Sequence, residues 1–282
     1  MEYLSPHFFI IGERKCGTSS LYRYLLAHPQ VLPCAVKEPQ YFTKPWWKRQ
    51  LEWKKYQALF PVKGQQSPLV MHWPELDKSG NLYHEEVHFD RAAGIDYVTG
   101  EASANTFYEA HPRAVKQRLP DIRLIVLLRE PVARTYSHYR MISRFKAEGR
   151  PTQALTNFDW DMRQAMEQVM KGKQSPILSP SLYIQQLEKW WRVFPKEQLL
   201  VIPTEALEGV EQGMAIMNRV TTFLGLTPFD FASELEKRYN QAPPKRLPEP
   251  ISSELRHFFA PYNQILEDRL GQHFNWNRYG TN

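Results

Sequence analysis

The chain has 282 residues, of which 42% are hydrophobic and 23% are charged, and its formal net charge is +6. This composition excludes a disordered chain, and no apolar run approaches the roughly 18 residues that a membrane span requires. Its two cysteines, Cys16 and Cys34, exclude a disulfide framework and a cysteine-based zinc site.

Three features bear on compartment and partners. The first residues, MEYLSPHFF, lack a basic region followed by a long apolar one, so we expect no signal peptide. Free thiols are typical of a reducing compartment, and we expect a cytoplasmic protein. The positive charge favours an anionic ligand or reflects a solvated surface rich in lysine and arginine. Because the cations are spread along the chain, we expect no nucleic acid as partner. Because no apolar run is long enough for a membrane span, we expect no membrane partner, and the oligomeric state stays open.

The first predicted strand is FFII, at 8–11, an apolar run that leads into a glycine-containing turn. Residues 18–27, TSSLYRYLLA, predict the helix that follows. His28 ends this helix, because the residue before Pro29 is pushed out of the helical region.

Residues 43–95 form a tryptophan-rich excursion from the strand and helix pattern. It holds Trp46, Trp47, Trp53 and Trp73 together with prolines and acidic residues. One interpretation is a segment over the carboxyl edge of the sheet that builds a substrate site. The other is a surface subdomain whose tryptophans pack a small core of their own.

The rest of the chain alternates between strands and helices. Further strands are predicted at 96–101, 122–128 and 199–203, and the nearly continuous apolar run at 122–128 is typical of a central parallel strand. Pro131 fits the first turn of the helix that follows. The remaining helices are predicted at 110–118, 158–171, 181–193, 211–224 and 251–270. This alternation predicts an α/β, P-loop-like three-layer fold with a central mostly parallel sheet flanked by helices, in a single domain over 1–282.

Residues 8–21, FFIIGERKCGTSSL, place a strand, a tight turn and a helix start in succession. The first N–H groups of a helix have no partner within it, and the helix dipole is positive there, so this arrangement binds anions. Lys15 adds a full charge, and Thr18, Ser19 and Ser20 add hydroxyl donors. The alternatives are a glycine turn with a surface lysine, and hydroxyls that only cap the helix.

The loop departs from the Walker A pattern of nucleotide kinases. Gly12 and Gly17 have the Walker spacing, but Thr18 follows the second glycine and the lysine lies earlier, at Lys15. The strand IVLL runs into arginine rather than into the aspartate of a Walker B strand. A P-loop nucleotide kinase or NTPase stays one alternative function, and a carbohydrate- or nucleotide-binding module without catalysis stays another.

Four blocks resemble sulfotransferases that use 3′-phosphoadenosine-5′-phosphosulfate (PAPS). IIGERKCGTSSLYRYLLAHP resembles their 5′-phosphosulfate loop, and RLIVLLREPVARTYSHYRM resembles their 3′-phosphate block. KEPQYF, at 37–42, and SLYIQQLEKWWRVFPKEQLLVI, at 181–202, are similar to the heparan-sulfate-type (carbohydrate) branch. The resemblance implies an enzyme that transfers the sulfuryl group of PAPS to a hydroxyl or amine of a glycan or a small natural product, releasing adenosine 3′,5′-bisphosphate (PAP).

The resemblance also implies roles for matched residues. Glu38 would be the general base, and Lys15 would stabilise the leaving phosphate. The residues expected to bind PAPS are Lys15, Cys16, Gly17, Thr18, Ser19, Ser20, Arg129, Ser137, Lys245 and Arg246. No metal is expected, because Lys15 and helix N-termini supply the positive charge and the histidines show no ligand spacing.

Each of these residues has a plainer interpretation as well. Arg129 could pair with Glu130, Ser137 could be an ordinary exposed helix serine, and Glu38 could be a surface carboxylate paired with Lys37.

The sequence departs from the carbohydrate branch at GEASANTF, at 100–107, where the branch has a lysine at the position of Ala102. The late basic, glycine-rich segment of the branch and its nearby cysteine pair are also missing. These departures leave open whether a second catalytic lysine is present and whether the acceptor resembles heparan.

Overall fold

The computed structural model describes residues 2–64, 69–76, 82–89, 94–237 and 247–276, and the chain forms two compact units. The first unit contains Met1–Glu13, Gly17–Leu127 and Val193–Asn240, and the second contains Arg14–Cys16, Leu128–Arg192 and Gln241–Asn282. The single domain predicted over 1–282 stays a prediction.

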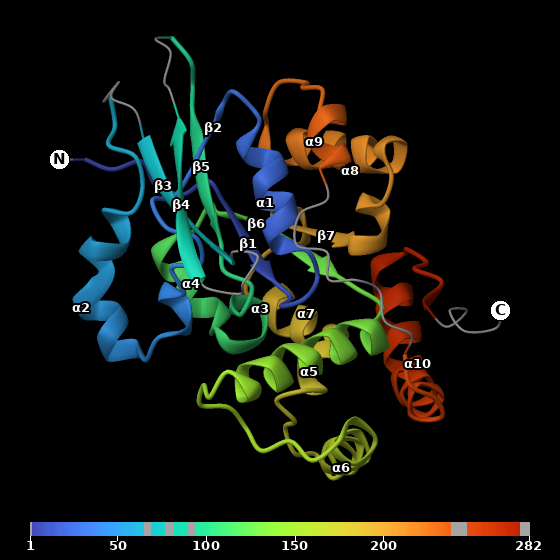
Figure 1. Ribbon diagram of the computed structural model, residues 1–282. Coiled ribbons are helices and arrows are strands. Elements are labelled where there is room, and N and C mark those ends of the chain that lie inside the picture. The colour runs from blue at the N-terminus through green and yellow to red at the C-terminus, as the bar shows by residue number, and fades with distance from the viewer. Residues whose placement is uncertain (1, 65–68, 77–81, 90–93, 238–246, 277–282) are drawn as a thin grey trace. The chain divides into compact units, whose positions relative to one another are not determined.

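A five-stranded sheet with the order β2-β5-β1-β6-β7 organises the first unit (Figure 1). Its strands are β1 (Phe8–Gly12), β2 (Val31–Leu32), β5 (Val98–Ala102), β6 (Arg123–Leu128) and β7 (Leu199–Pro203). Strand β1 pairs in parallel with β5 and β6, and β2 pairs in parallel with β5. Every residue of β1 is buried, as is every residue of β6 after its first, which is typical of strands covered on both faces. The predicted α/β fold with a mostly parallel central sheet is confirmed.

Helices and short 3₁₀ turns connect the strands of this unit. They are α1 (Thr18–Leu26), η1 (Tyr41–Thr43), α2 (Trp46–Gln57), α3 (Thr106–Glu109), α4 (Pro112–Arg118), η3 (Lys196–Gln198), η4 (Thr204–Leu207), α8 (Val210–Leu224) and α9 (Ala232–Glu236). Helix α1 contacts β1, β2 and β5, and α8 contacts β7. The helix predicted at 18–27 therefore lies on the sheet, with its N-terminus following the turn after β1.

The tryptophan-rich excursion contains α2 and an antiparallel hairpin of β3 (Leu69–Leu76) and β4 (Leu82–Phe89). Trp73 is buried and stacks on Tyr22 of α1, with 5.9 Å between the ring centroids, and Trp53 stacks on Tyr56 at 5.6 Å. Trp46 and Trp47 are 70% and 49% exposed. Two of the tryptophans therefore belong to the packing of the first unit and two lie on its surface, so neither sequence interpretation describes all four.

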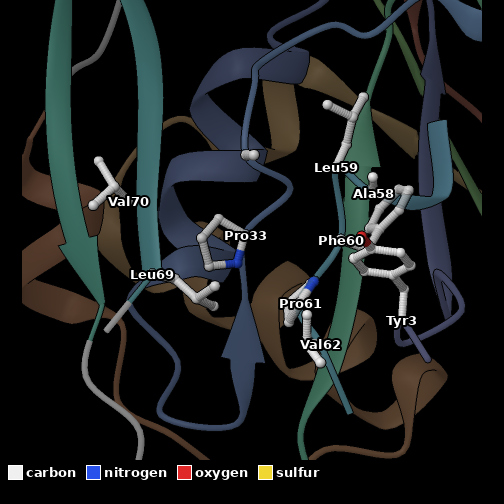
Figure 2. Close-up of a pocket in the computed structure, with 10 residues that line it drawn as sticks. Tyr3, Pro33, Ala58, Leu59, Phe60, Pro61, Val62, Leu69 and Val70 are labelled. Atoms are coloured by element: carbon white, nitrogen blue, oxygen red, sulfur yellow. The ribbon is translucent and has the colours of Figure 1, made fainter. Parts of the chain in front are cut away.

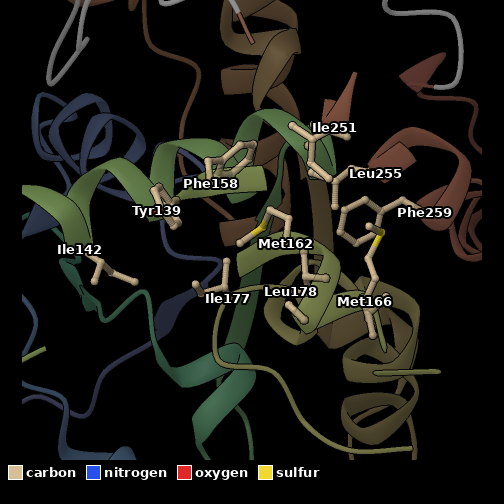
Figure 3. Packing of buried hydrophobic residues seen from close by; sticks show 13 residues of the cluster. Tyr139, Ile142, Phe158, Met162, Met166, Ile177, Leu178, Ile251, Leu255 and Phe259 are labelled. Carbon is tan, nitrogen blue, oxygen red and sulfur yellow. The ribbon is translucent and has the colours of Figure 1, made fainter. Parts of the chain in front are cut away.

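The second unit is helical. Its elements are α5 (Pro131–Ala147), α6 (Phe158–Met170), η2 (Ser179–Ser181), α7 (Tyr183–Trp191) and α10 (Ile251–Leu270). Helices α5, α6 and α10 share a buried apolar cluster, in which Met162 and Met166 of α6 face Leu255 and Phe259 of α10 (Figure 3). Within the described parts of the chain, none of the helices is long and apolar enough to cross a membrane.

Candidate functional site

The turn after β1 leads into a helix N-terminus without negative charge. Gly17 caps α1 with φ 82° and ψ 16°, a left-handed conformation that favours glycine. The first turn of α1 has no acidic residue, and its first backbone hydrogen bond runs from the N–H of Leu21 to the carbonyl of Gly17. The first N–H groups of a helix generally have no acceptor within it, and the positive end of the α1 dipole favours an anion.

Lys15 belongs to a group of cations in the second unit. Its φ of 72° is left-handed, and its backbone carbonyl accepts a hydrogen bond of 3.4 Å from Nη1 of Arg129. Burial lowers the pKa of Lys15, and the positive charges of Arg144, Arg129 and Arg140 lower it further. These side chains repel one another, so an anion bound among them would relieve the repulsion.

Tyr183, at the start of α7, contacts two predicted site residues, Arg129 through its backbone carbonyl and Cys16 through its thiol. Its buried hydroxyl donates a hydrogen bond of 2.8 Å to the carbonyl of Arg129 and lies 3.8 Å from Sγ of Cys16. Tyr183 carries no predicted role of its own, although the segment 181–202 that contains it resembles the carbohydrate branch. The tyrosine in that block is the only signal that could have identified it.

Helix α5 begins at a glutamate cap and contains one further predicted phosphate contact, Ser137. Glu130 accepts hydrogen bonds from the backbone N–H groups of Val132 at 2.9 Å and Ala133 at 2.6 Å. The carboxylate considered as a partner of Arg129 thus caps α5. Ser137 lies half-buried on the same helix, and among the described residues none hydrogen-bonds its hydroxyl.

Glu38 lies in the first unit, on the segment between β2 and η1. Its φ is 55°, and its Oε1 accepts a hydrogen bond of 2.8 Å from Nζ of Lys37. The pairing with Lys37 considered from the sequence is therefore present. The side chain of Glu38 is 28% exposed, so the carboxylate remains within reach of a ligand.

A buried carboxyl group, Glu101, occupies the next-to-last position of β5 in the same unit. It accepts hydrogen bonds from Oη of Tyr56 at 2.6 Å and from Oγ of Ser103 at 2.5 Å. Burial raises the pKa of Glu101 to about 7, the two hydrogen bonds oppose this rise, and the negative charge of Glu38 adds to it. The next residue, Ala102, is buried and provides no amine where the carbohydrate branch has lysine. Sequence reasoning missed Glu101 and Ser103, because nothing in GEASANTF shows which side chains point inward.

His138 of α5 is buried beside the loop residue Arg14. Nη1 of Arg14 donates to Nε2 of His138 over 3.3 Å, so the ring carries its proton on Nδ1. Burial lowers the pKa of His138 to about 2, and the charges of Arg134, Arg14 and Lys15 contribute. Burial and the surrounding positive charges therefore favour the neutral form of His138.

The structure also contains a pocket of about 180 Å³ in the first unit (Figure 2). Tyr3, Pro33, Phe60 and Val62 are among the residues that line it, and none of its lining residues is charged. This pocket does not suit a phosphate and contains no predicted site residue.

Two predictions cannot be placed on the structure. Lys245 and Arg246 lie outside the described residues. Among the residues that the structure describes, no group of three or more histidine, cysteine, aspartate or glutamate side chains could hold a metal ion.

Comparisons with known proteins bear on the whole chain. A family model described as a sulfotransferase domain matches residues 5–248. The chain is 29% identical to mouse carbohydrate sulfotransferase 15, over 96% of this chain and 54% of that protein. It is 27% identical to human bifunctional heparan sulfate N-deacetylase/N-sulfotransferase 2, over 79% of this chain and 22% of that protein. The chain thus spans about half the length, or less, of these curated relatives.

A solved structure agrees with the fold. A sulfotransferase from Alicyclobacillus acidocaldarius matches 98% of this chain and 99% of its own, with a TM-score of 0.65 and 23% sequence identity.

Proposed function

Because the chain belongs to the sulfotransferase domain family, we propose that it transfers the sulfuryl group of PAPS to a hydroxyl or an amine of a carbohydrate acceptor. The observation that carries this proposal is the contact between Lys15 and Arg129. The side chain of Arg129 donates a hydrogen bond to the backbone carbonyl of Lys15, and Tyr183 donates one to the carbonyl of Arg129. Such a group of cations, held by the fold, suits a ligand with more than one phosphate group.

The residues present fit the donor. The N-terminus of α1, from Gly17 to Ser20, suits the 5′-phosphate, with Lys15 supplying a full charge beside it in the sequence. Arg129 offers a planar guanidinium for the 3′-phosphate, and the hydroxyl of Ser137 can add a donor. When bound, the donor supplies an activated sulfuryl group attached to a phosphate that leaves. The contacts assigned to Lys245 and Arg246 remain predictions.

The chemistry assigned to this chain consists of charge stabilisation and one proton transfer. By analogy with phosphoryl transfer, most of the catalysis comes from positioning and from stabilising developing charge. Lys15 would donate a hydrogen bond to the phosphate oxygen on which charge grows. Because burial and the neighbouring arginines lower its pKa, its ammonium group is a stronger hydrogen-bond donor than that of an exposed lysine. Glu38 would accept the proton of the acceptor hydroxyl or amine.

A glycan is the acceptor class that the relatives support. The mouse relative is named as a carbohydrate sulfotransferase, and the human relative is named as a heparan sulfate N-deacetylase/N-sulfotransferase. Trp46 and Trp47 expose large aromatic faces, and such faces suit sugar rings. We place a small phenolic or amine natural product second.

The test is transfer of label from ³⁵S-labelled PAPS. The acceptors are N-deacetylated heparan sulfate, other uronate-containing glycans, neutral oligosaccharides and small phenols, each compared between the wild-type protein and Glu38→Gln. We expect label in at least one glycan and a loss of about a hundredfold or more in the variant. Undiminished transfer by Glu38→Gln would contradict the role of Glu38 as base. Labelled PAPS that is bound but never transferred to any acceptor would favour a binding module.

A further inference from the structure

A chain of hydrogen bonds connects Glu101 to the segment that carries Glu38. Oγ of Ser103 donates to Oε2 of Glu101 at 2.5 Å and accepts the backbone N–H of Gln40 at 3.1 Å. Oε1 of Glu101 accepts the hydroxyl of Tyr56 at 2.6 Å. Glu101 and Ser103 are each 0% exposed and Tyr56 is 3% exposed, so water does not compete for these bonds.

The segment held in this way has an unfavourable backbone. Glu38 has φ 55° and Gln40 has φ 49°, and the left-handed region costs a non-glycine residue on the order of 1 kcal/mol. Such residues persist only where their surroundings hold them. Side chains hold both polar groups of the Gln40 backbone: Ser103 accepts its N–H, and Oγ1 of Thr43 donates to its carbonyl at 2.9 Å.

The hydroxyl of Ser103 can accept from Gln40 because of Glu101. A hydroxyl has a single proton, and Ser103 donates it in the hydrogen bond to Oε2 of Glu101. The lone pairs of Oγ are then left to face the N–H of Gln40. The hydroxyl of Tyr56 in turn holds the Glu101 carboxyl in place from its other oxygen.

We infer that Glu101 and Ser103 are positioning residues for catalysis: by fixing the left-handed turn at Gln40, they hold the carboxylate of Glu38 in its reactive orientation. This inference rests on the proposed role of Glu38 as general base. Neither residue touches the reacting atoms. Their removal should therefore slow turnover while leaving the donor site as it is.

The test compares two buried serines that are changed in the same way. Ser103→Ala removes the acceptor of the Gln40 N–H. Ser252→Ala, on α10, is the matched control, because Ser252 is also 0% exposed and its Oγ donates at 2.7 Å to the carbonyl of Pro248. Each variant is assayed for kcat and KM with ³⁵S-labelled PAPS and the best glycan acceptor, for PAP affinity by calorimetry, and for thermal stability.

For Ser103→Ala we expect kcat to fall by about tenfold to a hundredfold, the size of effect that small misplacements of catalytic groups produce. The PAP affinity should stay within about twofold of wild type, and Ser252→Ala should keep both quantities. Tyr56→Phe keeps the aromatic ring and removes only the hydrogen bond to Glu101, so it should lower kcat by a few-fold. This variant tests the inference if Ser103→Ala fails to fold.

Three results would overturn the inference: unchanged kcat in Ser103→Ala and Tyr56→Phe, an equal loss of kcat in Ser252→Ala, or a parallel loss of PAP affinity. Glu38→Gln separates the two proposals. If Glu38→Gln is inactive while Ser103→Ala is fully active, only the positioning role fails. If Glu38→Gln is fully active, the general base has been misassigned and the positioning role fails with it.

Discussion

The hydroxyl of Tyr183 donates a hydrogen bond of 2.8 Å to the backbone carbonyl of Arg129, a residue 54 positions earlier in the chain. Nη1 of Arg129 in turn donates to the carbonyl of Lys15. The backbone carbonyls of both cationic residues therefore accept hydrogen bonds from side chains, that of Arg129 from Tyr183 and that of Lys15 from Arg129. A site built in this way is organised before its ligand arrives, which reduces the entropy that binding costs.

Removing the Tyr183 hydroxyl should weaken the donor site. Tyr183→Phe keeps the ring but leaves the carbonyl of Arg129 without this donor, a loss of roughly 1 kcal/mol or more. We expect PAP to bind about tenfold more weakly by calorimetry. The control is Tyr139→Phe on α5, which removes a hydroxyl bound to Asp161 at 2.9 Å and should leave PAP affinity unchanged. Equal PAP affinity in both variants would show that Tyr183 does not support the site.

The left-handed cap of α1 gives a second prediction. In Gly17→Ala the φ of +82° is strained, and the new Cβ would lie 3.3 Å from Cγ2 of Thr204. We expect a loss of about 1 kcal/mol or more in the free energy of unfolding together with weaker PAP binding. Gly271→Ala is the control, because Gly271 has φ +62° with nothing within 4 Å of the new atom. Gly271→Ala should lose a similar amount of stability against urea and keep its PAP affinity. A Gly17→Ala protein that binds PAP as tightly as wild type would refute the role of this cap.

The buried carboxyl of Glu101 predicts a pH dependence of stability. Its pKa is raised from 4.5 to about 7 in the folded protein, so folding favours the protonated form. The stabilisation is fully present below pH 4.5 and is lost as the pH rises through 7, by an amount on the order of 3 kcal/mol. Urea unfolding of wild type and Glu101→Gln between pH 4.5 and 8 measures it. We expect the stability of wild type relative to the variant to fall as the pH rises, and a constant difference would contradict the raised pKa.

Much of the fold could be predicted, because its elements have strong local signals. The apolar run ending at Leu128 and the proline at position 131 predict β6 and the start of α5, and the structure places both there. Helix α10 runs over the predicted 251–270. The hairpin of β3 and β4 was not predicted, because Pro74 and several charged residues interrupt any regular strand pattern. The order of the strands in the sheet has no local signal, since it depends on contacts between distant segments.

The candidate site could be predicted only where a motif carries it. Two features can be recognised from the sequence because each lies within one contiguous block: the loop from Gly12 to Ser20, and the pair of Arg129 and Ser137. The contact between Tyr183 and Arg129 joins two separate blocks, and the burial of Glu101 depends on the packing of α2 through Tyr56. Neither relationship leaves a periodic or compositional trace in the sequence.

The most direct test of the account is the thermal stability of the protein with excess PAP, compared with ATP and AMP. PAP at about 100 times its dissociation constant should add roughly 2.7 kcal/mol and raise Tm by several degrees. We predict this shift for wild type and its loss in Arg129→Ala. The control is Arg163→Ala, which removes an exposed arginine paired with Glu254 at 2.8 Å and should keep the shift. A shift with ATP and none with PAP would contradict the account and favour a nucleotide kinase, and a full PAP shift in Arg129→Ala would show that the 3′-phosphate binds elsewhere.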